Sequence, residues 1–315
     1  MVPNGIPQDT INTCASINSC MEQMRYSSRL LKLLDGTLEC NRQYFRAVVD
    51  ALTIKGNNPQ TIEYYLFGLH LFARNFKDTD LASLSQCEIA KGLSSIKDLH
   101  YSDHTVRHAK RSVKQFYTRL RGAPFASFIK LGNVQSTLRR SDLITRGELT
   151  DILNGAHTLR DRAIFALLYD GALRRGELLA LRIKDFDFGG DIVHVTLNGK
   201  TGVRTIPLTF SVPYLKAYLD ATPRLTNEAR LLDIGEPGLR MVMRRTTDRR
   251  DLGKRLYPQL FRTSRLTELA AIWPEQLVKK FAGWTPDSPM PLVYVHLNTA
   301  DLDRAVMAPL IAHIN

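Results

Sequence analysis

The sequence lacks features that would place the chain in a membrane, in a secretory pathway or in a zinc-binding class. No apolar run in its 315 residues is long enough to cross a bilayer. Near the N-terminus stand Asn4, Gln8 and Asp9, where a secretory signal needs a basic start and an apolar core. The four cysteines all lie in the first third and show no paired CxxC spacing. We therefore expect reduced thiols, no bound metal, no membrane association and a cytoplasmic location.

Acidic residues are also scarce. The chain has 31 Asp and Glu against 43 Lys and Arg, which gives a formal charge of +12 and a pI near 9.6. A basic excess of this size favours a polyanionic partner, nucleic acid first, although many basic proteins bind only ions or acidic proteins. With 44% hydrophobic and 23% charged residues, the chain has the composition and length of two globular domains.

The first part of the chain has the periodicity of helices. A variable extension over residues 1–40, with a helix expected over 21–34, has no readable role. After Asn58 and Pro59, apolar residues recur at steps of three and four and predict one buried helix face. They are Ile62, Tyr65, Leu66, Leu69, Phe72, Ala73 and Phe76.

A further helix should start near Ser102 and Asp103, which are favourable capping residues. One side of it is apolar, and the other carries four cations at steps of three and four. These are Arg107, Lys110, Arg111 and Lys114. Such a stripe can follow a phosphate backbone, and a solvated charged face is the alternative interpretation.

The helical period lapses around Pro124, Gly132 and Asn133. We accordingly expect a helical DNA-binding domain over residues 1–125, a linker over 126–141 and a second domain over 142–315. Thr145 and Glu148 have the spacing of a capping box at the first helix of that second domain. Two β-rich runs, 192–197 and 203–208, flank a Gly-rich turn and predict a hairpin with Lys200 at its tip.

Two arginines and a tyrosine carry most of the chemical information. Arg174 stands in Gly-Ala-Leu-Arg-Arg-Gly-Glu, Arg262 in Tyr-Pro-Gln-Leu-Phe-Arg, and Tyr294 in Tyr-Val-His-Leu. A planar guanidinium can hold two phosphate oxygens, so a pair of arginines can grip one phosphodiester and stabilise its transition-state charge without a metal. A tyrosine placed in line could attack that phosphate, unless it is an ordinary core tyrosine.

These motifs, in this order, resemble the tyrosine recombinase (phage integrase) family, with variant spellings similar to those of archaeal members. The resemblance rests on five features in the second domain, and on only a diffuse helical pattern in the first. The five are the motif from Arg174 to Glu177, the hairpin lysine Lys200, the motif from Pro258 to Arg262, the pair Gly283-Trp284, and Tyr294 with His296. It implies a mostly α chain with a small antiparallel β-sheet (α+β), in which a helical N-terminal DNA-binding bundle and a tyrosine-recombinase catalytic domain form a two-domain C-shaped clamp.

The resemblance also implies roles for individual residues. Arg174 and Arg262 would bind the scissile phosphate, and Tyr294 would attack it to give a 3′-phosphotyrosine. Lys200 would protonate the departing 5′ oxygen, and Trp284 would donate its indole N–H to the phosphate. Glu177 and His296 would support the site.

A nucleotide-binding loop is the competing interpretation of Lys200, because Gly199-Lys200-Thr201 imitates the end of that motif. The motif needs a further glycine where this chain has His194, and a helix where it predicts a strand. No nucleotide or other cofactor is therefore expected, and the turn lysine without a chemical role remains the plain alternative.

Gln259 departs from the family pattern. The family usually has histidine three residues before the second arginine, and commonly another after that arginine, where this chain has Thr263. Glutamine can donate to a phosphate but cannot carry a proton at neutral pH. Two alternatives to a site-specific recombinase or integrase stay open: a non-cleaving DNA-binding protein of recombinase descent, and a topoisomerase-like strand-passing enzyme.

The partners implied are double-stranded DNA attachment sites and further copies of the chain, as a homotetramer on DNA and a monomer in solution. Some of the further cations before the second arginine motif should contact DNA phosphates and position the protein without choosing a sequence, and the others are solvated surface. They are Arg240, Arg244, Arg245, Arg249, Arg250, Lys254 and Arg255. The segment after Asp301 either docks on a neighbouring copy or packs on its own domain.

Overall fold

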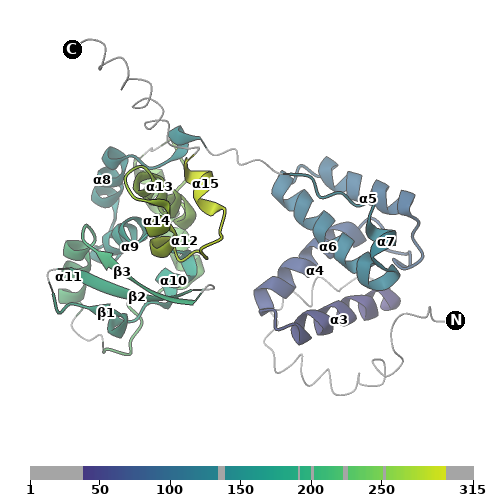
Figure 1. The fold of residues 1–315 in the computed structure, drawn as a ribbon, viewed down its shortest axis with the longest axis horizontal. Coiled ribbons are helices and arrows are strands. Elements are labelled where there is room, and N and C mark those ends of the chain that lie inside the picture. The colour runs from purple at the N-terminus through teal and green to yellow at the C-terminus, as the bar shows by residue number, and fades with distance from the viewer. Residues whose placement is uncertain are drawn as a thin grey trace, which may run out of the picture. The chain divides into compact units, whose positions relative to one another are not determined.

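A computed structural model describes residues 38–133, 139–190, 192–199, 202–222, 226–250 and 253–295 of the chain. The chain divides after Ser136 into two compact units. Figure 1 colours both units along the sequence. The helix expected over 21–34 and the segment after Asp301 lie outside the described residues.

The N-terminal unit is a small bundle of helices around one apolar core (Figure 1). Its helices are α3 (Glu39–Ile54), α4 (Pro59–Ala73), α5 (Gln86–Asp98), α6 (Asp103–Arg121) and α7 (Ala123–Ala126). The capping signals in the sequence are used. Asn58 accepts the backbone N–H of Thr61 at the start of α4, and Ser102 accepts that of Thr105 at the start of α6.

Helices α4 and α6 pack closely because a glycine lies between them. A Cβ on Gly68 would stand 2.5 Å from the Ser112 hydroxyl and 3.0 Å from the ring of His108. The expected apolar face of α4 is confirmed by the burial of Ile62, Leu66 and Leu69, among others. Helix α4 ends at Ala73, however, so Phe76 packs against the core from beyond the helix.

Buried packing of the N-terminal unit continues past α7. Ala126 and Ile129 are both buried in its core. Ordered contacts therefore extend into the first residues of the 126–141 segment.

The second unit is helical apart from one small sheet. Its elements are η2 (Arg140–Asp142), α8 (Arg146–Gly155), α9 (Leu159–Asp170), α10 (Arg175–Ala180), η3 (Ile183–Asp185), β1 (Phe186–Asp187), β2 (Val193–Gly199), β3 (Gly202–Leu208), α11 (Val212–Asp220), α12 (Glu236–Arg250), α13 (Pro258–Ala270), α14 (Glu275–Ala282) and α15 (Met290–Val295). Helix α9 lies at the centre and packs against α11 and α13. Six consecutive α9 residues, 163–168, are fully buried, as expected of a helix covered on all sides.

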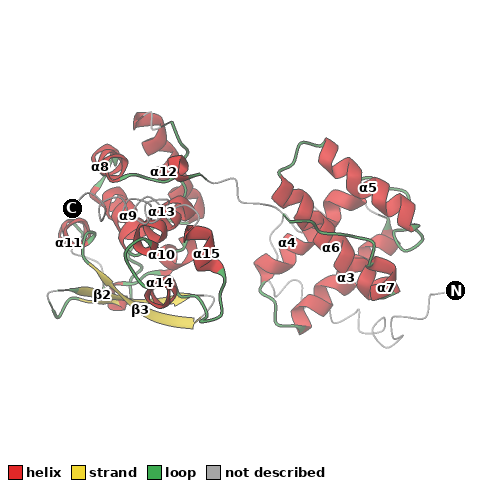
Figure 2. Ribbon diagram, turned by 45° about the horizontal axis from the view of Figure 1, so that its top comes forward, coloured by secondary structure: helices red, strands yellow, loops and turns green. Residues whose placement is uncertain are grey.

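The sheet is antiparallel in the order β1-β2-β3, with Val195 paired to Phe186 on one side and to Ile206 on the other. Burial alternates along β2, so one face of the sheet is covered and the other is open. Figure 2 shows helices on the covered face only. The mostly α fold with a small antiparallel sheet is thus confirmed.

Several local expectations can be checked against these elements. The capping box is present: the Thr145 N–H donates to Glu148, and the Glu148 N–H donates to the Thr145 hydroxyl. The hairpin pairs out to Gly199 and Gly202, so its turn is shorter than we expected. Helix α15 begins at Met290, one residue before a proline. A proline is tolerated in a first helical turn, so Pro291 does not prevent it.

No helix in the described part of the chain combines the length and apolar character needed to span a membrane.

Candidate active site

Arg174 stands immediately before α10, where its backbone and side chain meet the same acidic residue. Its backbone N–H donates to Oε2 of Glu177 at 2.8 Å, and its Nη1 donates to Oε1 at 2.8 Å. Its Nη2 donates to the carbonyl of Gly283 at 3.3 Å. The side chain is 28% exposed, so it is held by these contacts and remains partly accessible to solvent.

Glu177 is held by a second arginine as well. Nη1 and Nη2 of Arg204 donate to Oε1 and Oε2 at 2.7 and 3.0 Å, which is a bidentate pair. Burial by itself would raise the pKa of Glu177, but the hydrogen bonds and charges of Arg204 and Arg174 lower it to about 2. The carboxylate is therefore ionised at any physiological pH.

Arg262, on α13, is buried to 2% exposure and bonds only to backbone carbonyls among the contacts described. Nη1 donates to Ala172 and Nη2 to Ala282, each at 2.6 Å. Ala172 has a left-handed φ of 45°, an uncommon conformation for a residue with a Cβ, and it directs this carbonyl at the guanidinium. Burial lowers the pKa of Arg262 to about 10, with repulsion from Arg174 adding to the effect. A site with this excess of positive charge favours an anion.

Tyr294, on α15, lies within the electrostatic influence of these arginines. It is 2% exposed, and its ring centroid lies 5.3 Å from that of Trp284. The Cζ atom of Arg262 lies 5.8 Å from the Trp284 ring. Burial raises the pKa of the Tyr294 hydroxyl, while Arg262, a hydrogen bond with Thr263 and Arg174 act to lower it. The phenol is thus placed within the electrostatic reach of both arginines.

Gln259 lies one helical turn before Thr263 on α13. Its Nε2 stands 3.5 Å from the Thr263 hydroxyl, at the outer limit of a hydrogen bond. Thr263 in turn acts to lower the pKa of Tyr294, so Gln259 is linked to the phenol through Thr263.

The structure therefore brings together Arg174, Glu177, Arg262, Trp284 and Tyr294, and Gln259 contacts Thr263 on the same helix as Arg262. Lys200 and His296 lie outside the described residues. Sequence reasoning missed Arg204 and the contact from Thr263. A signal for Arg204 exists: it shares the inward face of β3 with Ile206 and Leu208 at a period of two, where a charged residue needs a partner.

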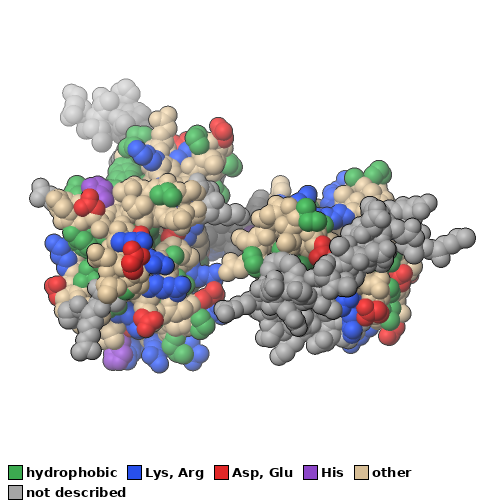
Figure 3. Space-filling model, turned by 90° about the horizontal axis from the view of Figure 1, so that it is seen from below, with side chains coloured by type: hydrophobic (Ala, Val, Ile, Leu, Met, Phe, Trp, Pro, Cys, Tyr) green, Lys and Arg blue, Asp and Glu red, His purple; other side chains and the backbone are tan. Residues whose placement is uncertain are grey.

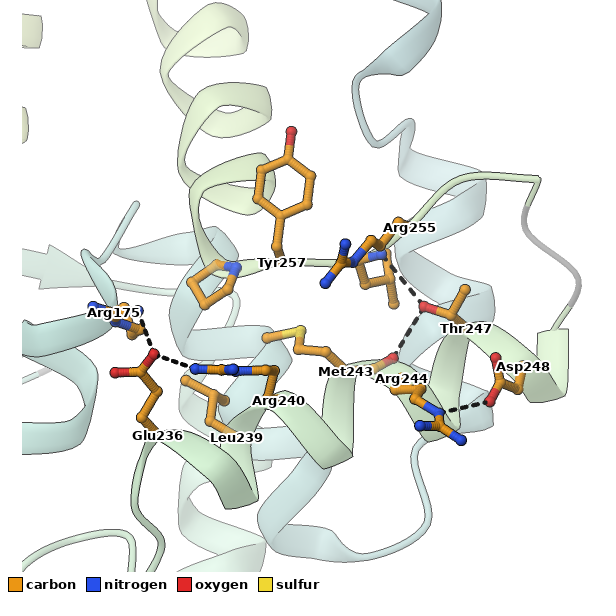
Figure 4. A pocket seen from close by; sticks show the side chains of 12 residues that line it. Arg175, Glu236, Leu239, Arg240, Met243, Arg244, Thr247, Asp248, Arg255 and Tyr257 are labelled. Carbon is orange, nitrogen blue, oxygen red and sulfur yellow. Dashed lines mark hydrogen bonds and ion pairs between the residues drawn. The ribbon is translucent and has the colours of Figure 1, made fainter. Parts of the chain in front are cut away.

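A cavity of about 620 Å³ opens beside the start of α13, and Figure 4 shows its lining. Glu236 is shared there by Arg175 at 2.7 Å and Arg240 at 2.6 Å, and Arg244 pairs with Asp248. Because Arg175 directly follows Arg174, this arginine-rich cavity adjoins the candidate site along the chain.

Most of the other expected DNA contacts lie on two helices, one in each unit. Lys254 and Arg255 follow α12 instead, and Lys254 pairs with Glu148 at 2.7 Å. On α6, Arg111 is exposed while Arg107, Lys110 and Lys114 are half-buried. On α12, Arg244, Arg245 and Arg249 are exposed, and Arg250 belongs to the same helix. Figure 3 shows Lys and Arg side chains on the visible face of both units.

No group of three or more His, Cys, Asp or Glu side chains within the described ranges is arranged to hold a metal ion.

Comparisons with known proteins agree with this geometry. The chain is 32% identical over 179 residues to the tyrosine recombinase XerC of Myxococcus xanthus, covering 52% of this chain and 58% of the relative. It is 28% identical over 186 residues to the tyrosine recombinase XerA of Pyrococcus horikoshii, covering 57% and 62%. The match thus spans less than two thirds of either curated relative.

Solved structures show the same fold. A lambda integrase dimer bound to a COC′ core site matches with a TM-score of 0.66 and 14% identity, over 91% of this chain and 87% of that one. XerH site-specific recombinase bound to a palindromic difH substrate matches with a TM-score of 0.64 and 18% identity, over 89% and 87%.

The fold is therefore the one seen in lambda integrase and in XerH recombinase. The Phage integrase family matches residues 143–301, half of the chain, and the chain belongs to that family.

Proposed function

We propose that the protein is a site-specific DNA recombinase or integrase that cleaves and rejoins DNA through a 3′-phosphotyrosine. The observation that carries this proposal is the convergence of two arginines on one buried tyrosine. Arg262 and Arg174 both act electrostatically on the Tyr294 hydroxyl, and the Trp284 ring lies close to both Arg262 and Tyr294. The similarity to tyrosine recombinases XerC and XerA supports it.

The reaction follows from this arrangement. The Tyr294 oxygen forms a bond to phosphorus as the bond to the 5′ oxygen breaks, and the arginines stabilise the charge on the two non-bridging oxygens. Trp284 donates its indole N–H to the same phosphate. The phosphodiester energy is kept in the phosphotyrosine, so rejoining requires no cofactor.

Two proton transfers complete the reaction. We assign to Lys200 the protonation of the leaving 5′ oxygen. The proton of Tyr294 leaves through its hydrogen-bonded surroundings, with Thr263 as the donor that stabilises the phenolate and Gln259 as the residue that orients Thr263. A water, a phosphate oxygen or His296 takes up the proton itself.

The partners in this proposal are duplex attachment sites, contacted by the α6 cations of one unit and the α12 arginines of the other. Exchange of four strand ends requires four protomers, so we propose a homotetramer on DNA, in the cytoplasm or nucleoid of a host cell.

A duplex library with a nick beside each potential cleavage site tests the proposal. Cleavage near a nick releases a short strand, and without its 5′-hydroxyl the covalent complex cannot be rejoined and accumulates. The wild-type chain should yield a protein–DNA adduct whose mapped linkage is at Tyr294, and Tyr294→Phe should yield none. Tyr257→Phe, a change at an exposed tyrosine of the same unit, is the matched control and should still react.

The other outcomes identify the alternatives. Sequence-selective binding without an adduct would indicate a non-cleaving DNA-binding protein. Adducts with relaxation of supercoiled DNA but no recombinant product would indicate a topoisomerase-like enzyme.

A further inference from the structure

Arg204 is a charged residue on the covered face of a strand. It lies on β3 two residues before Ile206, which is buried, and its own side chain is only 9% exposed. Arginine is seldom buried this far unless its charge is paired. The contacts of this side chain therefore decide what it does.

Each nitrogen of the Arg204 guanidinium has a described partner. Nη1 and Nη2 make the bidentate pair with Glu177, and Nε donates to the carbonyl of Phe281 at 3.0 Å. These bonds use three of its five N–H groups, and the side chain is only 9% exposed, so little of it is accessible to a DNA phosphate. Arg204 is thus suited to holding protein groups rather than substrate.

The backbone at Gly283 is shaped around the same side chain. Gly283 has a left-handed φ of 64°, and a Cβ there would stand 2.8 Å from Cδ of Arg204. The carbonyl of Gly283 accepts from Nη2 of Arg174. Arg204 therefore contacts both groups that anchor Arg174: the Glu177 carboxylate and the Gly283 turn.

Glu177 has two oxygens and two arginines to satisfy. Arg204 bonds to both oxygens, while the Arg174 side chain bonds to Oε1 alone. If Arg204 were absent, both oxygens of Glu177 could accept hydrogen bonds from the guanidinium of Arg174. The additional bond would rotate that guanidinium away from its present orientation. The bidentate pair prevents that rearrangement.

We propose that Arg204 is a positioning residue, which orients the Arg174 guanidinium toward the scissile phosphate through Glu177 and Gly283. The inference rests on the proposed cleavage function and deepens it. It differs from a purely structural ion pair in one respect: Arg204 should affect the rate of the chemical step while leaving DNA affinity nearly unchanged.

The test uses the full-length chain and the duplex that the wild-type protein cleaves in the nicked library. Arg204→Lys keeps the charge but loses the bidentate geometry. Its equilibrium affinity for the intact duplex should stay within about threefold of wild type, while the single-turnover rate of adduct formation at saturating duplex falls about 100-fold, the scale of an ångström-sized misplacement. Arg182→Gln, which removes an exposed arginine of the same unit, should change neither quantity.

A double-mutant cycle separates positioning from an independent effect. In an Arg174→Lys background, Arg204→Lys should slow adduct formation by less than about threefold, because the group it acts through is already altered. A full 100-fold loss in that background would overturn the proposal, as would an unchanged rate in Arg204→Lys alone.

A second variant covers the case in which Arg204→Lys does not fold. Gly283→Ala displaces the Arg204 stem and removes no charge, so it should also lower the rate at retained affinity. Retention of the full rate would overturn the proposal. If the wild-type chain itself forms no adduct, the proposed function fails instead, and the two failures are distinct.

Discussion

Burial raises the pKa of the Tyr294 hydroxyl and Thr263 is one of the groups that act to lower it, whereas the sequence alone suggested only that a histidine was missing at Thr263. Its hydroxyl can donate to a phenolate, which a valine of nearly the same shape cannot. Thr263→Val should therefore raise the pKa of Tyr294 further and displace the rise of adduct formation to higher pH. Below the pKa, the loss should be about tenfold, the value of one hydrogen bond to a charged group.

Single-turnover rates between neutral pH and pH about 10, the usual pKa of tyrosine, measure this displacement. Thr267→Val is the control, since Thr267 stands one turn further along α13 and donates to a backbone carbonyl instead. Superimposed pH profiles for wild type and Thr263→Val, with no displacement between them, would rule out this role for Thr263.

Glu177 makes a second prediction at the residue scale, this time about stability. Its pKa is about 2 in the folded chain against an ordinary value of 4.5. The lowered pKa of Glu177 contributes on the order of 3 kcal/mol to the free energy of unfolding. This contribution is fully present above about pH 4.5 and is lost as the pH falls toward 2.

Glu177→Gln removes this contribution and leaves two arginines without their carboxylate, so it should destabilise the second unit most at neutral pH. The difference in unfolding free energy from wild type should shrink between about pH 4.5 and 2, as followed by urea denaturation. A difference independent of pH would show that Glu177 is not the group that titrates.

The Gly283 turn joins α14 to the site and supplies a prediction at the scale of elements. Gly283→Ala places a Cβ both in a left-handed backbone and against Arg204. Gly253 has a similar φ of 61° and open space around it. Gly253→Ala should therefore cost about 1 kcal/mol of strain alone, while Gly283→Ala costs more.

Denaturant unfolding of the two variants measures the difference. Equal losses of unfolding free energy would mean that Arg204 moves aside without cost, and that the turn does not fix it.

Helices with strong local signals could be predicted from the sequence. The caps at Ser102 and Thr145 and the apolar face of α4 depend on residues within a few positions of one another, and each is present. Strand β1 could not be predicted in this way, because two residues become a strand only by pairing with β2.

The same distinction applies to the candidate site. The motifs around Arg174, Arg262 and Tyr294 carried enough local pattern to be recognised. The contact of Arg204 with Glu177 joins residues 27 positions apart, and that with Phe281 joins residues 77 apart. Contacts of this range depend on the assembled fold, so a single sequence shows the residue without showing its partners.

At the scale of the whole molecule, the net charge of +12 is distributed over helices in both units. Changing the four cations of the α6 stripe to glutamine should weaken duplex binding and make it less salt-dependent. The slope of log affinity against log salt should fall by about 0.9 for each DNA phosphate that the stripe no longer neutralises.

Binding isotherms at several salt concentrations test this, with Lys91→Gln and Lys97→Gln on exposed sites of α5 as the control. The rate of adduct formation at saturating duplex should not change, since the stripe and Tyr294 belong to different units. An unchanged slope would show that the four cations of the α6 stripe are solvated and do not contact DNA phosphates.

The carboxylate shared by Arg174 and Arg204 also constrains how this chain can evolve. A mutation at Glu177 leaves two cations facing each other, and a mutation at either arginine leaves the acid with half of its compensation. Because each single substitution is destabilising, these positions can change in evolution only together. Drift should therefore be slower at Arg204 than at its neighbour Val203, which is 68% exposed, although Arg204 need never touch DNA.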